Sequence, residues 1–109
     1  MPSYYLSEDL ARFGEISKNA PAQWEAFMAW YEKVMAPGAL DDKTKKLLAL
    51  AVAYAIQEPY CIDSYSAQCA EAGFSPEEMA EAVNVAAAIK GGGVLAHWAQ
   101  SCNTSVRNG

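Results

Sequence analysis

Residues 58–65, EPYCIDSY, carry the clearest prediction of the fold, because they mark a helix start with a cysteine in its first turn. Pro59 fixes its own φ angle and lacks an N–H group, so it suits the first turn of a helix. Glu58 then lies at or just before the N-cap, and Cys61 lies in the first turn. The free N–H groups and the positive dipole end of a helix N-terminus favour an anion. We therefore expect a lowered pKa for the Cys61 thiol and a nucleophilic, oxidisable sulfur.

Glu58 acts on the same thiol, and the sequence leaves the sense of its effect open. A carboxylate beside a thiolate raises the thiol pKa. The same carboxylate can instead accept a proton from the thiol or from a bound peroxide. Glu58, Cys61 and Tyr65 have the spacing i, i+3, i+7, so they share one helix face if the helix begins early enough. The plainer alternative is that Cys61 is inert packing, since cysteine is among the most buried residue types.

The segments before residue 58 also have helical patterns. A short acidic turn begins at Ser7 or Glu8 and ends at Gly14. A longer helix runs from Pro21 to about Met35, with apolar residues at a period of 3.6. Asp41 is a candidate N-cap for the next helix. The body of that helix, Leu47 to Ile56, is apolar on nearly all sides and predicts a central buried helix.

The segments after residue 65 predict further helices. Gly73 is a good residue to end the Cys61 helix, and Ser75-Pro76-Glu77-Glu78 is a capping-box start. Gly91-Gly92-Gly93 interrupts the helix that follows, and Val94 to about Cys102 forms a final short helix. The polar tail 103–109 is expected to fray. The chain is thus predicted to be one all-α domain over residues 1–109, a bundle of about five to six helices.

Composition excludes several classes of function. The chain has 109 residues, of which 52% are hydrophobic and 19% charged, and its formal net charge is −5. The negative charge argues against nucleic acid and against anionic membranes as partners. Residues 1–20 do not read as a signal peptide, and Leu47 to Ile56 is too short to span a bilayer, so we expect a cytoplasmic protein. The high apolar content predicts subunit interfaces and hence a homo-oligomer.

The remaining candidate residues give weaker signals. Three cysteines without scaffold-like spacing fit a reducing compartment. Cys61 and Cys69 would lie about 12 Å apart along one helix, too far for a disulfide, whereas Cys102 could approach either. His97 is a candidate acid–base group, although packing beside Trp98 is the plainer interpretation. The spacing of these residues predicts no metal site and no bound cofactor.

Four blocks of sequence, taken in order, resemble a known family. They are Lys45 to Ala53, Pro59 to Asp63, Ala72 to Met79 and Ala86 to Gly92, and the resemblance covers roughly residues 40–100. The chain resembles the carboxymuconolactone decarboxylase superfamily on its alkylhydroperoxidase D side, and it is also similar to the arsenosugar-biosynthesis-associated peroxidase-like subgroup. The resemblance implies an all-helical protomer that assembles into trimers or hexamers. It also implies an antioxidant thiol peroxidase that uses a C-x-x-C-x-x-x-H motif and an upstream glutamate.

Carried over by position, the family motif is incomplete in this chain. The peroxide-attacking cysteine corresponds to Cys61, and the resolving cysteine corresponds to Glu58, which cannot form a disulfide. The histidine corresponds to Tyr65, a poor proton shuttle at neutral pH, and the upstream glutamate corresponds to Lys46, which would stabilise a thiolate if it lay close. A one-cysteine peroxidase would need an external thiol reductant, unless Cys69 or Cys102 comes near.

Three hypotheses follow from these residues. The first is a thiol oxidoreductase in which Cys61 reduces a peroxide or another small electrophile, with Glu58, Tyr65, Lys46 and His97 as the candidate catalytic partners. The second is a non-catalytic oligomeric binding or interaction protein that has lost the cysteine pair. The third is lactone or decarboxylase chemistry with Glu58 as the acid or base, against which Tyr65 argues.

Overall fold

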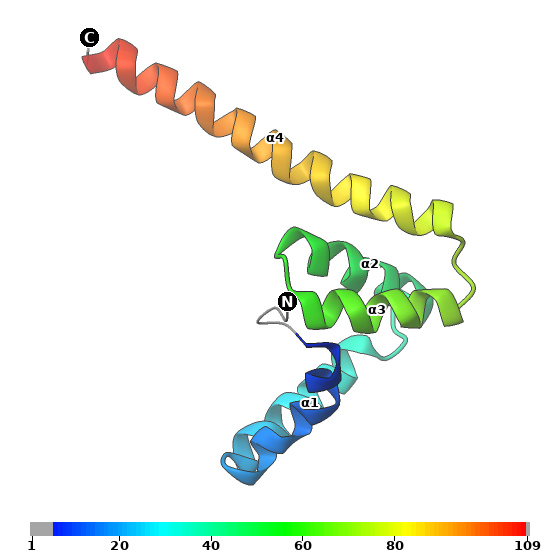
Figure 1. Ribbon diagram of the computed structural model, residues 1–109. Helices are drawn as coiled ribbons and strands as arrows, with labels where there is room; N and C mark the ends of the chain where they lie inside the picture. The colour runs from blue at the N-terminus through cyan, green and yellow to red at the C-terminus, as the bar shows by residue number, and fades with distance from the viewer. Residues whose placement is uncertain (1–5, 109) are drawn as a thin grey trace.

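The computed structural model of the chain describes residues 6–108, with side chains described for residues 6 and 8–103, and it is all-helical over that range. Its elements are the 3-10 helix η1 (Ser7–Lys18) and the α-helices α1 (Pro21–Met35), α2 (Asp42–Ala55), α3 (Pro59–Glu71) and α4 (Pro76–Asn108). Helices α2 and α3 lie side by side, η1 and α1 form a hairpin beside them, and α4 crosses over α2 (Figure 1). The predicted all-α architecture of five to six helices is confirmed.

The helix starts predicted near Pro21, Asp41, Pro59 and Ser75 are confirmed, and each depends on local chemistry. α1 has the predicted bounds, with Pro21 at its first position. The carboxylate of Asp41 accepts the Thr44 N–H at 2.7 Å and caps α2. At the start of α4, Ser75 Oγ accepts the Glu78 N–H at 3.1 Å while Glu78 Oε1 accepts the Ser75 N–H at 2.8 Å, a complete capping box. Gly73, with φ +94°, follows the C-cap of α3.

A small core lies between α2 and α3. Leu50 and Cys69 are 1% and 0% exposed, and Tyr65 packs with them at 6%. Two lysines tie neighbouring elements to this pair of helices. Lys45 Nζ donates to the carbonyls of Val34 and Ala36, at 2.7 and 2.6 Å, at the end of α1. Lys90 Nζ of α4 donates to the carbonyl of Ala55, at 2.7 Å, at the end of α2.

The prediction that residues 47–56 form a helix buried on nearly all sides is wrong for the single protomer. Only Leu50 and Ala53 of α2 are buried. Leu48, Val52 and Ile56 are 49%, 56% and 66% exposed. The physical reason is that α2 contacts α3 and α4 on part of its circumference only, so the protomer leaves an apolar face of this helix in contact with solvent.

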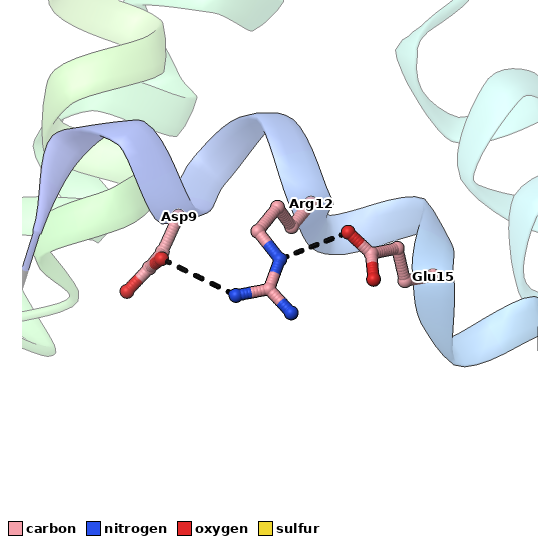
Figure 2. A network of polar contacts seen from close by, with 3 residues as sticks. All are labelled: Asp9, Arg12 and Glu15. Carbon is pink, nitrogen blue, oxygen red and sulfur yellow. Dashed lines mark hydrogen bonds and ion pairs between the residues drawn. The ribbon is translucent and has the colours of Figure 1, made fainter.

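The predicted break at Gly91 to Gly93 and the predicted end of a turn at Gly14 are also wrong. α4 is one continuous helix, because glycine weakens a helix without forbidding it. A Cβ atom added at any of the three glycines would meet no other atom within 4 Å outside the adjacent turns of the helix, so no close packing requires them. The predicted frayed tail is helical to Asn108, and its last residue, Gly109, lies outside the described residues. η1 continues past Gly14, which faces the Trp24 ring. Along its exposed side, Arg12 pairs with Asp9 at 3.9 Å and with Glu15 at 2.9 Å (Figure 2).

The protomer is extended for its size. Its radius of gyration is 18.5 Å, whereas about 13 Å is typical of a chain of this length. The C-terminal half of α4 projects beyond the other helices (Figure 1), and it exposes Val94, Leu95 and Trp98 by 67%, 71% and 68%. Within the described residues, no helix is both long enough and apolar enough to cross a membrane. The fold therefore leaves much apolar surface on the outside of one protomer.

Candidate functional site

A cavity of about 830 Å³ lies where η1 and α1 face the N-terminal half of α3 and the start of α2. One wall is apolar and largely aromatic, and it is formed by Leu10, Phe13, Trp24, Phe27, Met28, Tyr31 and Met35. The opposite wall is more polar and comes mainly from α3, with Glu58, Tyr60, Cys61, Ser64, Tyr65 and Gln68. The cavity thus has an apolar wall that faces the start of α3, where Glu58 and Cys61 lie.

Glu58 and Cys61 form a hydrogen-bonded pair at the N-terminus of α3. Glu58 is the N-cap residue, and its Oε2 accepts the backbone N–H of Cys61 at 2.6 Å. This bond lowers the pKa of the Glu58 carboxyl, which is therefore an anion at neutral pH. Burial, a hydrogen bond to the Glu58 carboxylate and the negative charge of Glu58 together raise the pKa of the half-buried Cys61 thiol to about 11.

The expectation of a lowered pKa for the Cys61 thiol is therefore wrong. The helix N-terminus does favour an anion, but the Glu58 carboxylate already accepts the N–H group of Cys61. A second anion on the sulfur would lie beside the first and partly out of water, and both factors favour the protonated thiol. The sequence left open whether Glu58 raises the thiol pKa or accepts a proton from the thiol. In the resting structure, its carboxylate raises the pKa of the Cys61 thiol.

Two tyrosines approach this pair from different helices. Tyr65 of α3 is 6% exposed and belongs both to the cavity wall and to the core. Tyr31 of α1 lines the same cavity as Cys61, and its pKa is raised first by burial and second by the charge that Cys61 can carry. Sequence reasoning missed Tyr31 as a site residue. The only signal for it was its place in the apolar stripe of α1, which does not reveal a neighbour 30 residues away.

Lys46 and His97, the two other predicted site residues, have different positions. Lys46 lines the cavity, and its Nζ lies 3.8 Å from Asp42 Oδ2. Its charge acts on Cys69, where it opposes the rise in pKa that burial causes. His97 is exposed on the projecting half of α4 and does not line the cavity. Thus Glu58, Cys61, Tyr65 and Lys46 come together in one protomer, while His97 stays apart.

The other two cysteines are also outside the cavity. All three cysteines are free thiols, with Cys69 buried in the core and Cys102 half-buried on α4. No group of three or more histidine, cysteine, aspartate or glutamate side chains in the described part of the chain is placed to hold a metal ion. Near Cys61, the described lining residues offer one thiol, the Glu58 carboxylate and phenol hydroxyls, and elsewhere on the wall they add the carboxylates of Asp9 and Asp42 and the ammonium group of Lys46.

Comparison with known proteins agrees with the all-helical fold. The chain is 39% identical over 87 residues to uncharacterized protein 4 in the cox locus of Paracoccus denitrificans, covering 80% of this chain and 78% of that protein. Its fold is similar to that of a carboxymuconolactone decarboxylase family protein from Legionella pneumophila, solved in its apo form. That similarity has a TM-score of 0.71 and 31% identity, over 85% of this chain and 84% of the other.

A second solved structure is similar over nearly its whole length. It is a carboxymuconolactone decarboxylase family protein from Thermotoga maritima, for which a part in an antioxidative response has been suggested. The TM-score is 0.60 with 28% identity, over 81% of this chain and 97% of the other. Residues 21–100 match the sequence model of the carboxymuconolactone decarboxylase family. This range includes α1, α2, α3 and most of α4. The chain therefore belongs to the carboxymuconolactone decarboxylase family.

Proposed function

We propose that this protein is a thiol oxidoreductase in which Cys61 reduces a peroxide that enters the cavity. The observation that carries the proposal is the pair at the cavity wall, in which the Glu58 carboxylate accepts the Cys61 backbone N–H at 2.6 Å and is close enough to the thiol to raise its pKa. A thiol held against a carboxylate has a proton acceptor ready at the moment when its sulfur attacks. The suggested antioxidative part of the Thermotoga maritima relative supports the same chemistry.

The proposed step balances with the groups present. The Cys61 sulfur attacks the nearer peroxide oxygen, and the O–O bond breaks as the S–O bond forms. The thiol proton passes to Glu58 and from Glu58 to the departing oxygen, which leaves as an alcohol or water. Cys61 becomes a sulfenic acid and Glu58 returns to its carboxylate form. Overall the proton moves from a thiol with a pKa of about 11 to an alkoxide or hydroxide oxygen, which is a far stronger base than a thiolate, so its net transfer is favourable.

Preformed thiolate does not explain such a reaction. With a pKa of about 11, only about one thiol in 10⁴ is ionised at pH 7. The proton must therefore leave during the attack, which gives Glu58 the role of general base and relay. Tyr31 and Tyr65 line the cavity, and we assign to their hydroxyls the donation of hydrogen bonds to a peroxide oxygen.

The sulfenic acid must then be reduced from outside the cavity. Since Cys69 and Cys102 do not line it, we assign the resolving step to an external thiol. Two molecules of that thiol convert the sulfenic acid back to the Cys61 thiol, and they yield one disulfide and one water. A requirement for such a reductant fits the cytoplasmic location expected from the sequence.

The test compares two reactions of one cysteine. Wild type, Glu58→Gln and Cys61→Ser are treated with hydrogen peroxide or cumene hydroperoxide at pH 7.5, and sulfenic acid is trapped and located by mass spectrometry. Glu58→Gln should slow peroxide oxidation of Cys61 by about tenfold or more, because it removes the relay. It should speed alkylation by iodoacetamide, because it removes the charge that raises the thiol pKa. Oxidation of Cys61 that is no faster than oxidation of Cys102 would refute the proposal.

A binding function without turnover is the second candidate. The raised pKa of the Cys61 thiol favours it, and so does the absence of a second thiol from the cavity wall. Unchanged ligand binding in Cys61→Ser, with no peroxide turnover in wild type, would favour this candidate over the first. Lactone chemistry finds less support, because the lowered pKa of Glu58 makes its carboxyl a weak reservoir of protons.

We also propose that the protein is a homo-oligomer, as a trimer or a hexamer. The protomer exposes 8261 Å², whereas about 5,900 Å² is typical of a monomer of this mass. The excess exposed area is comparable to the area buried in the interface of an obligate assembly. The exposed apolar residues of α2 and α4 contribute to this excess area. Light scattering should detect the oligomer, and Trp98→Asp should weaken it more than Asn84→Asp, which adds the same charge at another exposed position of α4.

A further inference from the structure

The charged groups around the cavity are unevenly distributed. Asp9, Asp42 and Glu58 contribute three carboxylates, and Lys46 contributes the one ammonium group among the described lining residues. That ammonium group is already engaged with Asp42 at 3.8 Å. Arg12 balances part of the charge of Asp9 from the exposed side of η1 (Figure 2), but it does not line the cavity. An anion that enters would therefore meet net negative charge with no free cation on the wall.

The opposite wall is built from aromatic rings held at fixed angles. Phe13 of η1 meets the Trp24 ring edge to face, with centroids 5.1 Å apart. Phe27 and Tyr31 lie one turn apart on α1, with centroids 5.7 Å apart. A volume of about 830 Å³ lies in the range of pockets that enclose small organic molecules. Rings with these orientations offer flat apolar contact and edge contact to an aromatic ligand.

We propose that this cavity is a binding site for an uncharged, flat apolar molecule and that its carboxylates discriminate against anions. The apolar wall supplies affinity by removing the ligand surface from water. Ser64 and Gln68 of α3, which share a hydrogen bond of 3.0 Å, place a hydroxyl and an amide on the polar wall for one polar substituent of the ligand. Reaction of such a molecule at Cys61 rests on the function proposed above, whereas its binding does not.

Charge selectivity is tested with two probes that share one ring system. Isothermal titration calorimetry of the full chain would compare 2-naphthylmethanol, which is neutral, with 2-naphthoate, which is an anion at pH 7.5. We expect the neutral probe to bind at least about tenfold more tightly, from the repulsion between an anion and the net negative charge of the lining residues. Asp42→Asn should reduce the ratio of the two affinities, neutral probe over anion, by about threefold. Glu71→Gln alters an exposed carboxylate outside the cavity and should leave this ratio unchanged. Equal or tighter binding of 2-naphthoate would overturn the proposal.

The location of the site is tested with a matched pair of variants on η1. Phe13 and Ile16 are 55% and 53% exposed, but only Phe13 lines the cavity. Phe13→Ala should weaken binding of 2-naphthylmethanol by about fivefold or more, whereas Ile16→Ala should not change it. An equal effect of both variants, or no binding of either probe to wild type, would refute the site.

Cys61→Ser separates this proposal from the proposed function. It should bind 2-naphthylmethanol as wild type does while losing peroxide oxidation at residue 61. Retained binding with an unreactive Cys61 in wild type would refute the oxidoreductase and leave the binding site standing. Fast oxidation of Cys61 with no binding of the neutral probe would refute the binding site and leave the oxidoreductase standing.

Discussion

Replacing Glu58 by glutamine should make the Cys61 thiol more acidic. Three causes raise the pKa of this thiol from 9.0 to about 11, with burial the largest, and the other two both come from the Glu58 carboxylate. Since each Glu58 contribution is smaller than that of burial, together they account for less than two thirds of the rise. Glu58→Gln keeps an oxygen that can accept the Cys61 N–H but removes the charge, so we expect a thiol pKa of about 10.

The assay is the pH dependence of thiol alkylation. Iodoacetamide reacts with the thiolate, so its rate at Cys61, followed by peptide mass spectrometry between pH 7 and pH 11.5, reports the pKa directly. At pH 8 the ionised fraction should rise from about 0.1% to about 1%, and the rate should rise roughly tenfold. Glu71→Gln, a matched change near the other end of α3, should leave the rate unchanged. A wild-type pKa near the free-cysteine value of about 8.5, or an unchanged pKa in Glu58→Gln, would refute the reasoning.

Three further predictions concern the fold. Acid should destabilise the protein, because the carboxyls of Asp41, Glu58 and Glu78 have lowered pKa values in the folded state. Their contribution to stability is complete above the pKa values of the unfolded state, about 4, and is lost as the pH falls through the pKa values of the folded state. Urea midpoints that do not fall between pH 6 and pH 3 would contradict this. Lys45→Met should lower the free energy of unfolding by about 0.5–1.5 kcal/mol, since it removes the donor to two exposed carbonyls, those of Val34 and Ala36, while the exposed Lys33→Met should cost little in the same urea titration. Gly92→Ala should raise stability by about 0.5–1 kcal/mol if α4 is continuous, and a lowered melting temperature would indicate a bend at this position.

Helix starts could be predicted from the sequence because the groups that make them are neighbours in the chain. Pro59, Asp41 and the Ser75–Glu78 box each act within four residues, so their effect does not depend on the rest of the fold. Gly92 could not be interpreted in this way. Whether glycine breaks a helix depends on what the surroundings demand, and around α4 nothing demands a bend.

The residues of the site could largely be predicted from the sequence, but the direction of the pKa change at Cys61 could not. The sequence identified Glu58, Cys61, Tyr65 and Lys46, and the fold brings them to one cavity. It did not reveal Tyr31, because the contact between α1 and α3 is tertiary. It also did not give the sign of the pKa change at Cys61, because that sign depends on burial and on the direction in which the Glu58 carboxylate points.

Residue 58 therefore decides which atom carries the negative charge at the start of α3. A helix N-terminus offers a limited set of free N–H groups, and the N–H of Cys61 would otherwise be available to a thiolate in the same turn. Glu58 accepts that N–H at 2.6 Å, and a carboxylate ionises far more readily than a thiol. The anion consequently lies on residue 58, and the sulfur keeps its proton. A cysteine at position 58, as in the C-x-x-C motif that this stretch resembles, would leave the N–H to the thiolates and add a partner for a disulfide. A glutamate there replaces an ionised thiol by a thiol and a base, so any reactivity of Cys61 must be coupled to proton transfer.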